Sequence, residues 1–201
     1  MKALVEPVGD LLAIDPSIVK TGVALFRAGK LVSAERVRFD KDWASLDIGL
    51  RACRCADAVM RWGMARDMSP RTLVYELPQV YTASKSKGDP NDLIKTALVA
   101  ANLTGMIRYA MAGRDISMNI LAPHPSDWIG QIPKKVAAGP AAWDSPRGYR
   151  IKIALSPEEF AAIVPSDDSI DAAGIGLWAL GRLGGDTWRN LGFSSPYISL
   201  A

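Results

Sequence analysis

Short apolar runs, each bounded by turn-forming residues, mark the first forty residues of the chain. Residues 11–15 are almost wholly apolar and end on an acid, residues 21–26 form a second run, and residues 31–39 alternate between apolar and polar side chains. Runs of this length and spacing are typical of β-strands. We predict a meander of three antiparallel strands joined by tight turns.

The pattern changes to a helical period at residues 44–66, where apolar side chains recur every three to four positions. Residues 72–76 form another apolar strand that also ends on an acid. Asn91 or Asp92 can cap a helix that continues to about residue 111. That helix is rich in small and apolar residues, so it can serve as core alone or also as a dimer face.

The last third of the chain predicts one more strand and two more helices. Residues 116–122 form a fifth strand, and residues 147–155 favour a short helix. Ser166 or Asp167 caps a last helix that ends at Gly184-Gly185. The order β-β-β-α-β-α-β-α predicts an α/β fold with a five-stranded mixed sheet and helices on both faces.

Length and composition fit one soluble globular domain. The chain has 201 residues, of which 49% are hydrophobic and 22% charged, and this composition excludes a disordered or fibrous protein. We predict a single domain over residues 1–184 and an irregular tail over residues 185–201. The sequence has no charged-then-apolar leader and no apolar run of about 18 residues, so we expect a cytoplasmic protein without membrane contact.

Two cysteines and one histidine limit the chemistry that side chains alone can perform. Cys53 and Cys55 lie two apart in a predicted helix, where their side chains diverge, so a disulfide or a zinc site is not expected. His124 lies between two prolines, in a rigid turn rather than on a catalytic arm. Carboxylates with a metal ion are the better candidates for catalysis.

Four acids stand where apolar strands end or where the last helix begins. They are Asp15, Glu76, Asp168 and Asp171. A carboxylate at the end of a buried strand is costly unless it meets a cation, a donor or a ligand, and acids three apart in a helix share a face. Carboxylate oxygens suit Mg²⁺, and two ions about 4 Å apart can clamp both oxygens of a phosphoryl transfer.

Each acid also has a purely structural interpretation. Asp15 can cap the Pro-Ser turn that follows it, Asp168 and Asp171 can favour the positive end of their helix, and Glu76 can pair with an arginine. Spacing alone leaves the structural and the metal-binding interpretations open.

Three segments taken together resemble the RuvC-type Holliday junction resolvases, which are nucleases of the RNase H-like fold. The runs Ile-Asp-Pro-Ser at residues 14–17 and Thr-Gly-Val-Ala at 21–24 resemble the first motif of that family. Residues 73–76 resemble its second acidic strand, and Asp-Ser-Ile-Asp-Ala-Ala at 168–173 resembles its last motif. The resemblance spans about residues 10–184, and the loose motifs look most like the bacteriophage branch.

The resemblance implies a homodimeric endonuclease that cuts symmetrically related strands of a four-way DNA junction with two Mg²⁺ or Mn²⁺ ions per site. The implied catalytic and metal-binding residues are Asp15, Glu76, Asp168 and Asp171, with Asp167 as the alternate to Asp168. Water attacks the phosphorus in line and the second ion stabilises the departing 3′ oxygen. Such chemistry needs no histidine or lysine base.

Charge is unevenly distributed, although the whole chain carries only +3. Residues 128–155 hold five basic residues and one acid, whereas residues 156–171 hold five acids and no base. Phosphate-binding residues beside a metal site give this pattern, and so do ordinary solvated loops. The resemblance favours DNA contacts by Tyr81, Lys85, Lys87, Lys134, Lys135, Arg147 and Arg150. Trp143 is a further candidate, for stacking on a base.

Two other functions compete with junction resolution. A phosphotransferase of the actin and sugar-kinase superfamily also begins with an acid, a turn and Thr-Gly-Val, but it needs two such domains and a Gly-rich adenosine motif. A catalytically inactive junction-binding protein is the second alternative, and the presence of all four acids argues against it.

Overall fold

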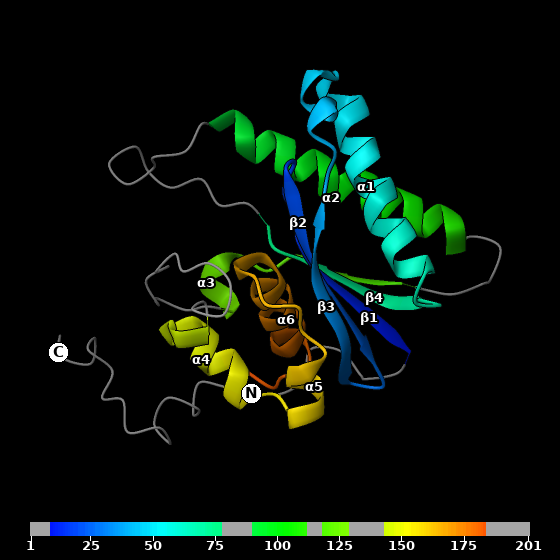
Figure 1. Ribbon diagram of the computed structural model, residues 1–201. Coiled ribbons are helices and arrows are strands. Elements are labelled where there is room, and N and C mark those ends of the chain that lie inside the picture. Colours follow the sequence, from blue (N-terminus) through cyan, green and yellow to red (C-terminus); the bar gives the residue numbers. More distant parts are fainter. Residues whose placement is uncertain (1–8, 78–89, 112–117, 129–142, 184–201) are drawn as a thin grey trace, which may run out of the picture.

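A five-stranded mixed sheet forms the centre of the computed structural model, which describes residues 9–77, 90–111, 118–128 and 143–183 (Figure 1). The strands are β1 (Asp10–Asp15), β2 (Lys20–Arg27), β3 (Lys30–Arg38), β4 (Pro70–Tyr75) and β5 (Asn119–Leu121). Their order is β3-β2-β1-β4-β5. The first three pair antiparallel, and β4 runs parallel to both β1 and β5. The predicted sheet is therefore confirmed.

Helices cover both faces of this sheet, as predicted. They are α1 (Ile48–Met64), α2 (Pro90–Met111), α3 (Pro125–Trp128), α4 (Pro146–Ile153), α5 (Pro157–Ala161) and α6 (Asp167–Ala179), with a 3₁₀ turn η1 (Lys41–Ser45). In Figure 1, α1 and α2 lie together on one side of the sheet, and α6 lies on the other with α3 and α4 beyond it. The protein thus has separate apolar layers on the two faces.

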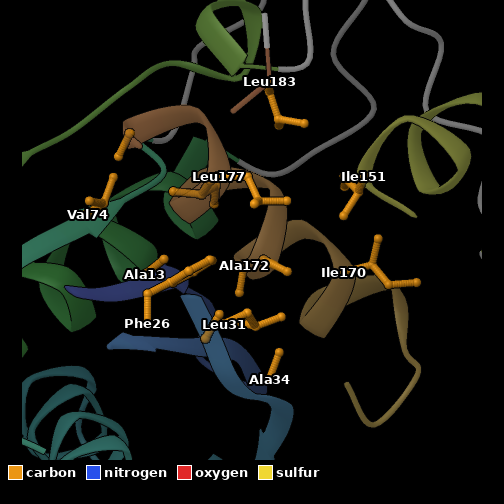
Figure 2. Close-up of a cluster of buried hydrophobic side chains, with 14 of the residues drawn as sticks. Ala13, Phe26, Leu31, Ala34, Val74, Ile151, Ile170, Ala172, Leu177 and Leu183 are labelled. Atoms are coloured by element: carbon orange, nitrogen blue, oxygen red, sulfur yellow. The ribbon is translucent and has the colours of Figure 1, made fainter. Parts of the chain in front are cut away.

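The layer between α6 and the sheet surrounds the central strands. Ala13, Phe26 and Val74 from three strands meet Ala172 and Leu177 of α6, and all five are buried (Figure 2). Small residues in α6 let it lie close to its neighbours: a side chain at Gly176 would overlap the ring of Phe26. Because α6 is enclosed by the sheet and by α3 and α4, its sequence is apolar nearly all round.

Two helix ends differ from the sequence-based expectation, and both differences come from capping residues. The helix predicted over residues 44–66 begins only at Ile48, because the Asp47 side chain accepts from the backbone of Gly49 and caps it. The last helix ends before Gly181, which has φ of +70°. Arg182 N donates to Leu177 O there, in a Schellman arrangement, so the helix stops short of Gly184.

The cysteines are both free, as expected, but only Cys55 is a core residue. Burial raises the pKa of its thiol to about 11. Cys53 is exposed, so it does not belong to the core. Within the residues described, no helix is long and apolar enough to span a bilayer. The expected domain over residues 1–184 and tail over 185–201 stay predictions, because residues 184–201 lie outside the described part.

Candidate metal and DNA site

Two of the four acids leave neighbouring strands at the same end of the sheet. Asp15 is the last residue of β1, and Glu76 directly follows β4, which runs parallel to β1. Glu76 N donates to Ile14 O at 3.2 Å, which continues the ladder past the end of β4. The sheet therefore brings both carboxylates to one edge, although about 60 residues of sequence separate them.

The first turn of α6 reaches the same edge by direct backbone contact. Asp15 lies opposite Gly22 in the β1–β2 ladder, and a Cβ on Gly22 would overlap the carbonyl group of Asp168. Glycine is therefore required at this position, since any side chain would push α6 away from the sheet. Asp168 and, one turn on, Asp171 are thereby brought to the edge where Asp15 ends its strand.

Asp168 forms ion pairs with two basic side chains that the sequence had not marked as functional. Arg36 Nε on β3 donates to Asp168 Oδ2, and Lys20 Nζ on β2 lies 3.1 Å from the same oxygen. Asp167, the alternate ligand, lies in the same turn of α6 and is half-buried. Contact with two strands of the sheet supports Asp168 as the member of the pair that faces the site.

Asp171 pairs with Arg147 in the interior. Arg147 Nε lies 3.0 Å from Asp171 Oδ1, and the two side chains are only 6% and 4% exposed. Arg147 was expected to contact DNA from the surface, whereas here it neutralises an acid inside the site. Leaving either charge buried without the other would cost several kcal/mol, about 3–5 by analogy with other buried pairs. The two opposite charges therefore compensate each other in the interior.

Glu76 is held by a residue that the sequence had not marked as functional. The indole Nε1 of Trp128, at the end of α3, donates to Glu76 Oε2 at 2.8 Å, and Trp128 is 1% exposed. The adjoining backbone is fixed as well, since Leu77 N donates to Pro123 O at 2.8 Å.

The remaining DNA-binding candidates fall into two groups. Arg150 donates to the carbonyls of Trp128 and Leu183, and burial lowers the pKa of its guanidinium, so it braces the interior around α3 and α6. Trp143 is buried against Phe160, with ring centroids 4.8 Å apart, and does not present its face to a base. The others lie outside the described residues: Tyr81, Lys85, Lys87, Lys134 and Lys135.

The donor chemistry fits a hard divalent ion, because the ends of β1 and β4 and the first turn of α6 bring carboxylates to the same edge of the sheet. As the side chains stand, however, no three acidic, histidine or cysteine side chains of the described segments are grouped closely enough to hold a metal ion. Asp168 and Asp171 instead pair with basic side chains of the chain itself. Any ion that entered would have to compete with Lys20 and Arg36 for Asp168.

Comparison of the whole fold with solved structures identifies its architecture. RuvC of T. thermophilus in complex with a Holliday junction substrate superposes with a TM-score of 0.54 and 14% identity, covering 92% of this chain and 96% of that one. The yeast mitochondrial Holliday junction resolvase Ydc2 gives a TM-score of 0.50 and 14% identity, with 93% and 84% covered. The chain has the RNase H-like fold. No family model and no curated protein matches the sequence.

The three motifs implied an RNase H-like fold, and this expectation is confirmed. At 14% identity the likeness establishes architecture rather than activity. Neither structure is described as a bacteriophage protein, so the bacteriophage placement stays a prediction, as does the cytoplasmic location.

Proposed function

We propose that this protein is a metal-dependent, structure-specific endonuclease that resolves four-way or branched DNA junctions as a homodimer. One observation carries the proposal: Asp15, Glu76 and the first turn of α6 meet at one end of the sheet. The fold is the one found in a RuvC that was solved with a Holliday junction.

Asp15, Glu76, Asp168 and Asp171 are the proposed ligands for two Mg²⁺ or Mn²⁺ ions. When bound, such ions would supply an activated water and stabilise the departing 3′ oxygen of a phosphodiester. The chain's own residues hold these carboxylates in place: Trp128 orients Glu76 through its N–H, and Arg147 pairs with Asp171. Tyr81, Lys85, Lys87, Lys134 and Lys135 remain proposed DNA contacts.

The test is cleavage of labelled four-way and linear DNA, in Mg²⁺ and in EDTA. We expect paired nicks at the junction that require Mg²⁺ and that Asp15→Asn abolishes, while junction binding is retained. Asp57→Asn, a partly exposed acid that pairs with Arg61 on α1, is the matched control and should cleave normally.

Three outcomes would contradict the proposal. Junction binding without cleavage would favour the inactive junction-binding protein. ATP-dependent phosphate transfer would favour the phosphotransferase. Cleavage that survives Asp15→Asn would place the reaction elsewhere on the molecule.

A further inference from the structure

Asp168 shares its carboxylate with two side chains of the sheet, and the strand register explains how both reach it. Lys20 lies opposite Arg38, and Gly22 lies opposite Arg36, in the antiparallel β2–β3 ladder. Alternate residues of a strand point to the same face, so Lys20, Arg36 and Arg38 present their side chains on the face where Gly22 contacts α6. Because Gly22 has no side chain, Arg36 can extend across it to Asp168.

These two ion pairs are much more accessible than the one at Asp171. The side chain of Lys20 is 44% exposed and that of Arg36 is 22% exposed, whereas Arg147 is 6% exposed. Ion pairs open to solvent contribute little to stability and are screened by salt. Lys20 can therefore leave Asp168 at small cost and Arg36 at a larger one, because Arg36 and Asp168 are only 22% and 16% exposed, whereas Arg147 is fixed to Asp171.

The same two cations are placed beside the proposed cleavage site, on its outer side. Lys20 begins β2 and Arg36 lies near the end of β3, and Arg38, opposite Lys20, is exposed and continues the basic surface. A DNA backbone phosphate brought to the acids would meet these side chains, and lysine and arginine are the residues that bind such phosphates.

We propose that Lys20 and Arg36 are exchangeable counter-ions of Asp168. This inference rests on the proposed function and deepens it. Without DNA they occupy Asp168 and oppose the binding of a divalent ion. With DNA they turn to backbone phosphates and leave Asp168 available as a ligand. Binding of DNA and of metal then favour each other, and by linkage the effect is equal in both directions.

The first test measures Mn²⁺ binding in the absence of DNA, by titration calorimetry or from the electron paramagnetic resonance signal of free Mn²⁺. We expect Lys20→Ala and Arg36→Ala each to bind Mn²⁺ about threefold more tightly than wild type, and the double variant about tenfold, because a competing ion pair and a like charge are removed. Lys20→Arg keeps the charge and should match wild type. Arg61→Ala, which removes an exposed ion pair on α1, is the second control.

Binding of a four-way junction in EDTA gives the second test. The double variant should bind more weakly than wild type, and the log–log slope of its affinity against salt should be shallower by about 0.9 for each phosphate that it no longer neutralises. Adding the junction should then tighten Mn²⁺ binding by wild type more than by the double variant.

The outcomes separate this proposal from the proposed function. If wild type binds the junction but the double variant shows unchanged or weaker Mn²⁺ affinity without DNA, the counter-ion proposal is wrong while the nuclease stands. If the double variant binds the junction as tightly as wild type, with the same salt slope, the phosphate contacts are wrong. If wild type binds no junction at all, the proposed function falls, and the exchange with it.

Discussion

Gly22 is the residue at which the sheet and α6 touch backbone to backbone. A methyl group there would overlap the carbonyl of Asp168, and backbone cannot rotate away as a side chain can. We expect Gly22→Ala to lower the free energy of unfolding by about 1–3 kcal/mol, as overpacking does elsewhere, and to reduce cleavage because Asp168 moves. Urea unfolding measures the first effect and junction cleavage the second.

The matched control for Gly22→Ala is Gly105→Ala. A Cβ on Gly105 of α2 would meet nothing within 4 Å, so alanine there should stabilise the helix by up to about 1 kcal/mol. Equal destabilisation by both substitutions would show that Gly22 is not a special point of contact.

Trp128 is expected to act on Glu76 through a single hydrogen bond. Trp128→Phe removes the N–H that Glu76 Oε2 accepts but leaves an aromatic ring in the cavity. Hydrogen bonds to charged groups contribute about 1.5–3 kcal/mol, so we expect the cleavage rate to fall about tenfold or more, with junction affinity unchanged. Single-turnover cleavage and a binding titration separate the two quantities.

Trp62→Phe provides the comparison for Trp128→Phe. Trp62 is also buried, but its indole N–H has no hydrogen-bond partner among the described residues. Its substitution reduces ring volume and weakens the stacking of Arg66 over the ring, but it removes no indole hydrogen bond of the kind that Trp128 makes. Equal loss of activity in both variants would mean that packing, not the bond to Glu76, explains the effect.

At the scale of elements, α5 and the residues that follow α6 are tied together by one ion pair. Glu159 accepts two hydrogen bonds from Arg182, at 2.6 and 2.7 Å, and one from Leu31 N of β3 at 2.9 Å. Arg182 also donates to the carbonyls of Gly29 and Ala154. Two helices and an edge strand are thereby joined beside the α6 layer.

This pair predicts a stability difference that depends on pH. The hydrogen bonds from Arg182 hold the pKa of Glu159 at about 2, against an ordinary 4.5. A lowered pKa in the folded state stabilises the protein above pH 4.5, and the stabilisation is lost as pH falls toward 2. We expect Glu159→Gln to be less stable by about 2–3 kcal/mol at pH 7.

Urea unfolding of wild type and Glu159→Gln between about pH 7 and pH 2 checks this expectation. The gap between the two proteins should stay constant down to about pH 5 and then close. Glu158→Gln is the comparison: Glu158 is exposed on the same helix, and the hydrogen bond from Ser156 also lowers its pKa, so we expect a smaller gap that closes in the same direction. A gap that is independent of pH would mean that the charge of Glu159 is not what stabilises the tie.

Elements with a strong local signal were predictable from sequence, and those that depend on distant partners were not. The apolar runs predicted all five strands, and Ser166 was correctly expected as a cap of α6. The short helix α5 was missed, although Ser156 and Glu159 form a capping box that marks its start. The helix ends at Asp47 and Gly181 are each set within a single turn, the first by the capping side chain of Asp47 and the second by the positive φ of Gly181.

The candidate site was predictable only in part, for a related reason. Acids at strand ends stand out in a sequence, because apolar runs lead up to them. Their counter-ions do not: Arg36 and Asp168 are 132 residues apart and meet only through the β2–β3 register and the close approach at Gly22. Arg147 was expected to contact DNA because it lies in a basic stretch, whereas the structure buries it.

At the scale of the whole molecule, α2 has one face packed and one face open. Val99, Leu103 and Ile107 are buried toward α1 and the sheet. The opposite side presents Tyr109 and Ile94, which are 87% and 60% exposed, on a stripe with small residues that lines a shallow hollow around Gly105. An apolar stripe of small residues lets two helices approach closely, so it suits a second copy of this chain.

A dimer formed through this stripe would place two active sites about one two-fold axis, as paired cleavage of a junction requires. We expect wild type to sediment as a dimer and Gly105→Glu to sediment as a monomer, because two carboxylates would face each other across the axis without room for water. We expect the substitution to leave folding intact, since a Cβ at Gly105 meets nothing within 4 Å. The control is Met64→Glu, at an exposed apolar residue on α1, which should remain a dimer.

The Gly105→Glu monomer should still bind the junction but give single rather than paired nicks. A wild type that is monomeric at tens of micromolar would exclude this interface, whereas a dimeric Gly105→Glu would move it to another face of the molecule.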